Sequence, residues 1–164
     1  IKMSEKVFYE DHDYATFPCS KAKSILPLDL FIYGYRIGDV TQSVSAENQL
    51  KRIGHTETVL KRMTAEGKSF TGAAALYCAK KTHLLLLSFL VTSLLCDKDR
   101  KAGRKRADEM MDFMDKEYHI VYEMSRKHCK ILKTLNRLHI GLNGYNRILN
   151  SKLYNKVRHN KSFE

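Results

Sequence analysis

The sequence contains no tryptophan, and it has only two prolines and eight glycines among its 164 residues. Because proline and glycine interrupt regular structure, their scarcity excludes collagen-like and low-complexity chains and favours helices. Hydrophobic residues make up 43% of the chain and charged residues 29%, a balance that excludes an intrinsically disordered protein. At this length we expect a single domain, residues 1–164, with a core of its own.

Acidic residues are absent from residues 124–163, a stretch that carries ten lysines and arginines. The net charge of +11 is therefore concentrated toward the C-terminus, since residues 1–97 carry twelve basic and ten acidic side chains and residues 98–123 carry seven of each. A surface of one sign attracts polyanions such as nucleic acids, acidic glycoproteins and anionic lipids. A solvated basic face that only keeps the protein soluble is the alternative.

Long apolar runs are also lacking, because the longest stretch without a charge is the fifteen residues 82–96, THLLLLSFLVTSLLC. This is shorter than the roughly 20 residues that a transmembrane helix needs. Its apolar side chains would lie on every side of a helix, which predicts a buried central helix. Any leucines on the face away from the core are where contact with a membrane or a partner would begin. The apolar residues of the run are Leu84, Leu85, Leu86, Leu87, Phe89, Leu90, Val91, Leu94 and Leu95.

The remaining pattern is helical, with no alternation long enough to need a sheet. Residues 1–27 are expected to form an irregular arm, because Pro18 and Pro27 argue against a helix there. Gly67 is a typical helix end, and Gly54 is a candidate break. We therefore predict an all-α, up-and-down bundle of four to five helices with long central members. The predicted helices span about residues 40–66, 71–98, 106–139 and 145–157.

Four cysteines, Cys19, Cys78, Cys96 and Cys129, are candidates for two disulfides. Within one helix Cys78 and Cys96 lie about 27 Å apart, whereas a disulfide needs about 7 Å or less between its Cα atoms. If the next helix folds back antiparallel, Cys129 lies level with Cys78, which favours the pairs Cys78–Cys129 and Cys19–Cys96. The sequence begins at Ile1 and not at Met, so the chain is either truncated or the processed product of a precursor. We favour a processed, secreted chain, in which disulfides are common. Four free buried thiols are the alternative.

Signals of catalysis are weak. The seven histidines form no HExxH motif and no Cys/His pair at metal-binding spacing, and the chain has no glycine-rich phosphate loop. The methionines near residue 110 are expected to fill the core. We therefore expect neither an enzyme nor a resident cofactor or metal.

Basic residues give a stronger indication, and they fall into three groups. Four lie at helical spacing on one side of the third predicted helix, six form a cluster between helices, and three lie on the last helix. Such stripes can follow phosphates, but no recognised nucleic-acid motif accompanies them, which makes a nucleic-acid partner the less favoured one. The groups are Arg126, Lys130, Lys133 and Arg137; Lys98, Arg100, Lys101, Arg104, Lys105 and Arg106; and Lys152, Lys156 and Arg158.

One stretch resembles a known family. A helix ends at Gly67, Ser69 and Thr71 precede the next helix, and the triplet Ala75-Leu76-Tyr77 is followed by Lys80-Lys81. In this order of features, residues 60–95 are similar to the two central helices of the abalone sperm lysin and eighteen-kilodalton acrosomal protein family. The resemblance covers about a quarter of the chain and includes no catalytic signature.

The resemblance implies a five-helix, non-enzymatic fertilisation protein, secreted from the sperm acrosomal vesicle. Its partners would be egg membrane lipids, with promotion of membrane fusion, or an acidic egg-coat glycoprotein whose binding loosens the vitelline envelope. The missing tryptophan, the cysteines and the aliphatic second helix favour the fusion branch of the family. A homodimer would cover the apolar surface in water. A helical nucleic-acid-binding protein is the alternative from another class.

Overall fold

The structure is a computed structural model that describes residues 5–31, 34 and 45–151, and within these residues it contains helices and no strand. The predicted all-α bundle is confirmed. The helices are α1 (Asp11–Lys21), α2 (Ala46–Lys51), α3 (Ile53–Gly67), α4 (Gly72–Val91), the π-helix η1 (Thr92–Cys96), α5 (Arg100–Glu117), α6 (His119–Arg137) and α7 (Leu142–Leu149).

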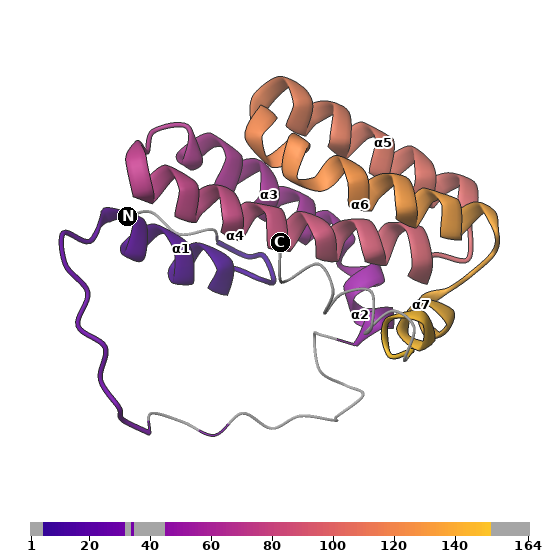
Figure 1. Cartoon of the computed structure of the whole chain (residues 1–164), viewed down its shortest axis with the longest axis horizontal. Coiled ribbons are helices and arrows are strands. Elements are labelled where there is room, and N and C mark those ends of the chain that lie inside the picture. Colours follow the sequence, from indigo (N-terminus) through magenta and orange to yellow (C-terminus); the bar gives the residue numbers. More distant parts are fainter. Residues whose placement is uncertain (1–4, 32–33, 35–44, 152–164) are drawn as a thin grey trace.

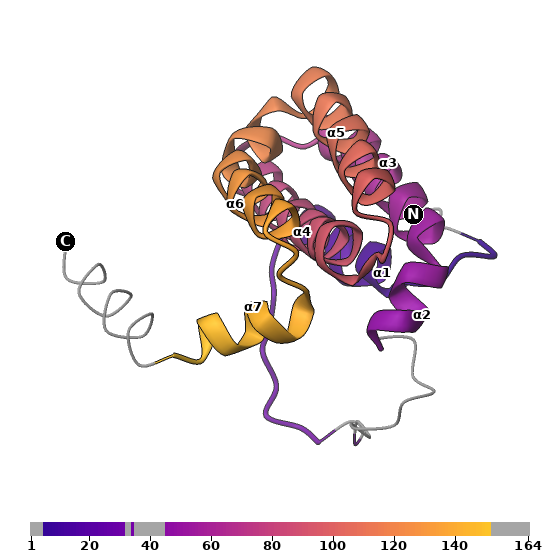
Figure 2. The ribbon, with the colours of Figure 1, turned by 90° about the vertical axis from the view of Figure 1, so that its right-hand side faces the viewer.

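Four long helices, α3 to α6, form the bundle (Figures 1 and 2). They run up and down, so that α3 packs on α4 and α5 packs on α6. Helix α4 is central, since it also contacts α6 and carries α1 along its outer side. Helix α7 lies at one end of the bundle and contacts η1.

The core is built around the apolar run, as the sequence predicts. Leu86 and Leu90 of α4 and Leu94 of η1 have no exposed surface. They belong to one apolar cluster with Leu60 and Met63 of α3 and with the methionines of α5. Burying a side chain of this size contributes about 1.5–3 kcal/mol, so the run is a main source of stability.

Helix α4 and η1 together, Gly72–Cys96, are long and apolar enough to cross a membrane by length and composition alone. The sequence analysis held that the charge-free run is too short to span a membrane. That argument was wrong, because the helix begins ten residues before the run and reaches 25 residues. A core helix of a bundle has the same length and composition, and seven α4 residues are buried between neighbouring helices.

The N-terminal arm is less irregular than predicted, because residues Asp11–Lys21 form α1 with Pro18 inside it. The expectation that proline excludes a helix there was wrong. Phe17 is 1% exposed in the core, and Asp13 lies 3.2 Å from Arg62 of α3. These tertiary contacts outweigh the backbone hydrogen bond that Pro18 removes. The described residues of the predicted arm on either side of α1, 5–10 and 22–27, are irregular as expected.

The first long helix was predicted as one element over residues 40–66, and the described part of it consists of α2 and α3. The break falls at Arg52, whose φ of −108° and ψ of 18° leave the helical region, and Gly54 lies inside α3. Residues 40–44 lie outside the described residues.

The third predicted helix, residues 106–139, is two antiparallel helices, so that prediction was wrong. Tyr118 adopts φ −150° and ψ 63° and reverses the chain between α5 and α6 (Figure 1). Helix α5 also begins at Arg100, so most of the basic cluster that was predicted between helices, residues 98–106, is helical. Of the last predicted helix, 145–157, the structure describes α7, Leu142–Leu149, and residues 152–157 lie outside the described part.

Candidate functional site

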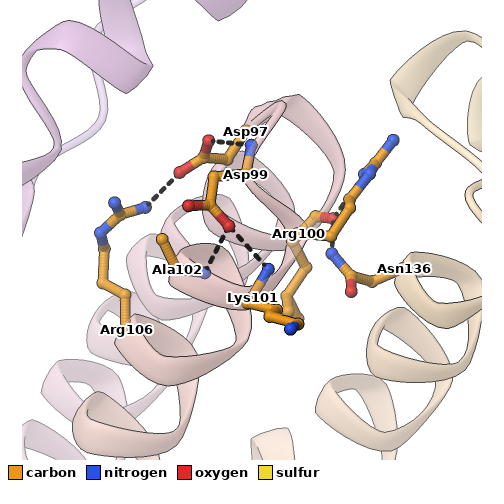
Figure 3. Close-up of polar contacts among 8 residues, drawn as sticks. Asp97, Asp99, Arg100, Lys101, Ala102, Arg106 and Asn136 are labelled. Atoms are coloured by element: carbon orange, nitrogen blue, oxygen red, sulfur yellow. Dashed lines mark hydrogen bonds and ion pairs between the residues drawn. The ribbon is translucent and has the colours of Figure 1, made fainter.

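The predicted basic cluster divides into residues that bond inward and residues that face solvent (Figure 3). Arg100 donates to the Leu94 carbonyl at 2.9 Å, and Arg106 pairs with Asp97 at 3.2 Å. Arg104 donates to the side-chain oxygen of the buried Asn136. These three arginines hold η1, α5 and α6 together, which removes them from the predicted binding surface. The exposed members are Lys98, Lys101 and Lys105.

The reason for this division is the π-helix. Carbonyls in the last turn of a helix lack intrahelical partners and need donors from elsewhere. Leu94 lies in the last turn of η1, and Arg100 is one donor to its carbonyl. Asn136 supplies a second donor to Leu94, from its side-chain nitrogen at 2.6 Å. Asp99 begins α5 by accepting from the backbone N–H groups of Ala102 and Lys101 at 3.0 Å each, and these bonds lower the pKa of its carboxyl group.

The predicted stripe on α6 is also partly engaged. Arg126 bonds to Glu123 at 2.7 Å, and Lys133 pairs with Asp108 of α5. Lys130 and Arg137 are exposed. The third group, Lys152, Lys156 and Arg158, lies outside the described residues.

Exposed apolar side chains gather in two places, of which the first is residues 25–31, here called the apolar segment. Its five large apolar side chains are 67–101% exposed. Figure 1 shows the chain leaving the end of α1 and running away from the helices through this segment. The sequence analysis did not predict it as a site, although the clustering of apolar residues around Pro27 was visible. The five residues are Ile25, Leu26, Leu28, Leu30 and Phe31.

The second place is a groove of about 210 Å³ between α4, α6 and α7, here called the α4/α6/α7 groove. Leu87 and Val91 of α4 line one side of it, and they are only partly buried. Leu84, 59% exposed, lies one turn before Leu87 on the same face of α4. These three are the apolar residues of the run that are not fully buried. The opposite wall includes Ile131, Leu135, Tyr145 and Ile148.

Two of the helices that line the groove, α6 and α7, are rich in basic residues. Its walls on α6 and α7 come from residues 128–149, within the stretch that contains no Asp or Glu. Lys127 and Lys130 on α6 and Arg147 on α7 are exposed beside these wall residues in the sequence. Apolar surface and positive charge thus occur together on α6 and α7.

The four cysteines are free thiols, and the predicted disulfides were wrong. Contacts between His83 and Ser125 and between Leu94 and Asn136 fix the register of α4 and α6 at an offset of 42 residues. Cys129 is therefore level with Leu87, about 13 Å along the helix from Cys78. It misses Cys78 because the chain reverses again at Tyr118, so that α6 runs parallel to α4.

The pair Cys19–Cys96 fails for a related reason. Helix α1 runs antiparallel to α4, and Cys19 lies beside Tyr77 near the start of α4. Cys96 is at the end of η1, about 28 Å further along the same helix axis. Burial raises the pKa of Cys78, Cys96 and Cys129.

Histidines meet at one end of the groove. His83 of α4 is 2.8 Å from the hydroxyl of Ser125, and its ring centroid is 6.1 Å from that of His128. Burial and the neighbouring His128 lower the pKa of His83. Among the described residues, no group of three or more His, Cys, Asp or Glu side chains is placed to hold a metal ion.

Comparison with known proteins finds no matching family model, no matching curated protein and no matching solved structure.

Proposed function

We propose that this protein binds anionic lipid bilayers and perturbs them, with basic residues docking it and exposed apolar side chains entering the headgroup region. The observation that carries the proposal is the apolar segment, whose five large side chains are at least 67% exposed. Soluble monomers seldom expose this many large apolar side chains together, and such a group typically marks a surface that binds a partner or a membrane. The resemblance to acrosomal proteins would place the activity at the surface of an egg.

Electrostatics supports a lipid as the partner. Each lysine or arginine near an anionic bilayer contributes about 1 kcal/mol to binding. Lys127 and Ile131 of α6 are four residues apart and both are exposed, so they share a face of the helix, and docking through Lys127 brings Ile131 to the lipid surface. Apolar side chains then insert at the boundary between headgroups and acyl chains.

The test uses the full chain with vesicles of phosphatidylcholine alone or mixed with phosphatidylserine, at physiological salt. We expect co-sedimentation and lipid mixing with the anionic vesicles only. The variant Leu26→Ser/Leu30→Ser is expected to keep binding and lose lipid mixing, because both residues lie in the apolar segment and away from the core. The variant Lys127→Glu/Lys130→Glu is expected to lose binding.

A matched control is Lys101→Glu/Lys105→Glu, which reverses two exposed charges on α5, away from the groove. It is expected to bind more tightly than Lys127→Glu/Lys130→Glu, although total charge is equal. The proposal fails if the native chain leaves anionic vesicles unbound. Loosening of an egg envelope without lipid mixing would favour a glycoprotein-binding function. Tight nucleic-acid binding without vesicle binding would favour a helical nucleic-acid-binding protein.

A further inference from the structure

His83 and His128 face each other across the interface of α4 and α6, although they are 45 residues apart in the sequence. Their rings are tilted by 55°, so they do not stack. His128 is exposed at the end of the α4/α6/α7 groove, and His83 is partly buried behind it. The spacing of histidines along the sequence did not reveal this pair, because only the register of the two helices brings them together.

From this arrangement we infer that His83 and His128 form an open two-histidine site for a divalent transition-metal ion. Two imidazoles on one tetrahedral ion have ring centroids about 5 Å apart, given a metal–nitrogen distance of about 2.0 Å. The observed centroid distance is 6.1 Å. Rotation of the exposed His128 side chain would have to bring the two ring centroids about 1 Å closer.

Ser125 supplies the feature that distinguishes a metal ligand from a chance neighbour. Its buried hydroxyl lies 2.8 Å from Nδ1 of His83 and holds that ring in place. When Nδ1 donates its proton to the hydroxyl, the free lone pair is on Nε2. Histidine ligands of metals commonly have their second nitrogen held in this way.

The chemistry of the ligands selects the ion. Imidazole suits Zn²⁺, Cu²⁺ and Ni²⁺, whereas Mg²⁺ and Ca²⁺ prefer oxygen ligands. Two protein ligands leave the other coordination positions to water, so the site is weaker than a closed structural zinc site and can accept a further ligand. A bound ion would join α4 to α6 beside the groove. This inference is independent of the proposed membrane function.

The experiment is titration of the full chain with Zn²⁺ by calorimetry, in a Cys19→Ser background so that the exposed thiol does not bind the ion. We expect one Zn²⁺ per chain, at least tenfold weaker binding in both His83→Gln and His128→Gln, and a higher melting temperature with Zn²⁺ only when both histidines are present. Ser125→Ala is expected to weaken binding by a smaller factor. His119→Gln is the matched control, because His119 is an exposed histidine of the same helix with Asp115 as its neighbour.

A second readout needs no substitution at the site. Cu²⁺ bound to the same background is expected to give an electron paramagnetic resonance spectrum with two nitrogen ligands, and imidazole NMR signals of His83 and His128 should broaden before that of His119. The inference is overturned if Zn²⁺ does not bind, if the His83 and His128 variants bind it as tightly as the parent, or if the His119 variant loses binding equally.

Discussion

At the scale of single residues, His83 links acidity to stability. Burial and His128 lower its pKa from the ordinary 6.5, so the folded chain binds this proton more weakly than the unfolded chain does. Both states are neutral above about pH 7, and acidification therefore favours the unfolded chain. We predict that the free energy of unfolding is highest above the unfolded pKa and decreases as pH falls through 6.5 toward the lower folded value.

The measurement is urea denaturation at a series of pH values from about 5 to about 8. His83→Gln should reduce the decrease without removing it, because burial also lowers the pKa of His12. His139→Gln, at an exposed residue, is the control and should follow the parent. An unchanged pH dependence in His83→Gln would contradict the prediction.

Individual residues also show what sequence can and cannot say about a basic surface. Arg100, Arg104 and Lys130 look alike in the sequence, yet two of them bond inward and one faces solvent. The difference comes from the π-helix, whose Leu94 carbonyl needs a donor, and no local pattern in residues 92–96 predicts that geometry. The sign of the charge was predictable, but its exposure depended on tertiary contacts.

At the scale of the helices, Gly103 fixes how closely α5 approaches η1. A Cβ at this position would lie 2.1 Å from the Ser93 carbonyl oxygen, so no side chain fits without backbone movement. We predict that Gly103→Ala lowers the free energy of unfolding by about 1–3 kcal/mol or more. Urea denaturation measures the change.

Gly54→Ala is the matched control for this substitution. Gly54 lies in α3 with no atom within 4 Å of an added Cβ, so alanine should raise the free energy of unfolding by about 0.5–1 kcal/mol through helix propensity. Opposite signs for the two variants are the expected result. A stabilising Gly103→Ala would show that η1 and α5 are not in close contact.

Helix boundaries were predictable where the apolar pattern changes and not where it continues. Helix α4 was correctly placed because Gly67 and Thr71 precede a long apolar run. The turn at Tyr118 was missed because Met114 and Val121, seven residues apart, stay in phase across it, as they would in one helix. Neither proline nor glycine marks that turn.

At the scale of the whole molecule, α1 belongs to the same packed unit as the bundle. Phe17 is 1% exposed in the core, and the Tyr77 hydroxyl donates to the Ala15 carbonyl at 3.0 Å. We predict that Phe17→Ala lowers the free energy of unfolding of the entire domain by about 3–5 kcal/mol. Thermal unfolding followed by circular dichroism measures this.

Leu26→Ser provides the comparison, because its side chain is 80% exposed in the apolar segment. Its effect should stay within about 0.5 kcal/mol, as for most surface substitutions. If Phe17→Ala left the main unfolding transition unchanged, α1 would be an independent appendage and not part of the domain.

The path of the chain after α1 has a consequence for how this helix is held. Residues 22–31 are irregular and exposed, so a protease that cuts there would separate α1 from the bundle without touching the core. After the cut, the fragment that contains α1 would be a peptide bound to the helical bundle, with Phe17 and Asp13 as the anchoring residues. In the intact chain the same contacts are made at the effective concentration set by the linker, which keeps α1 bound even where the free peptide would dissociate.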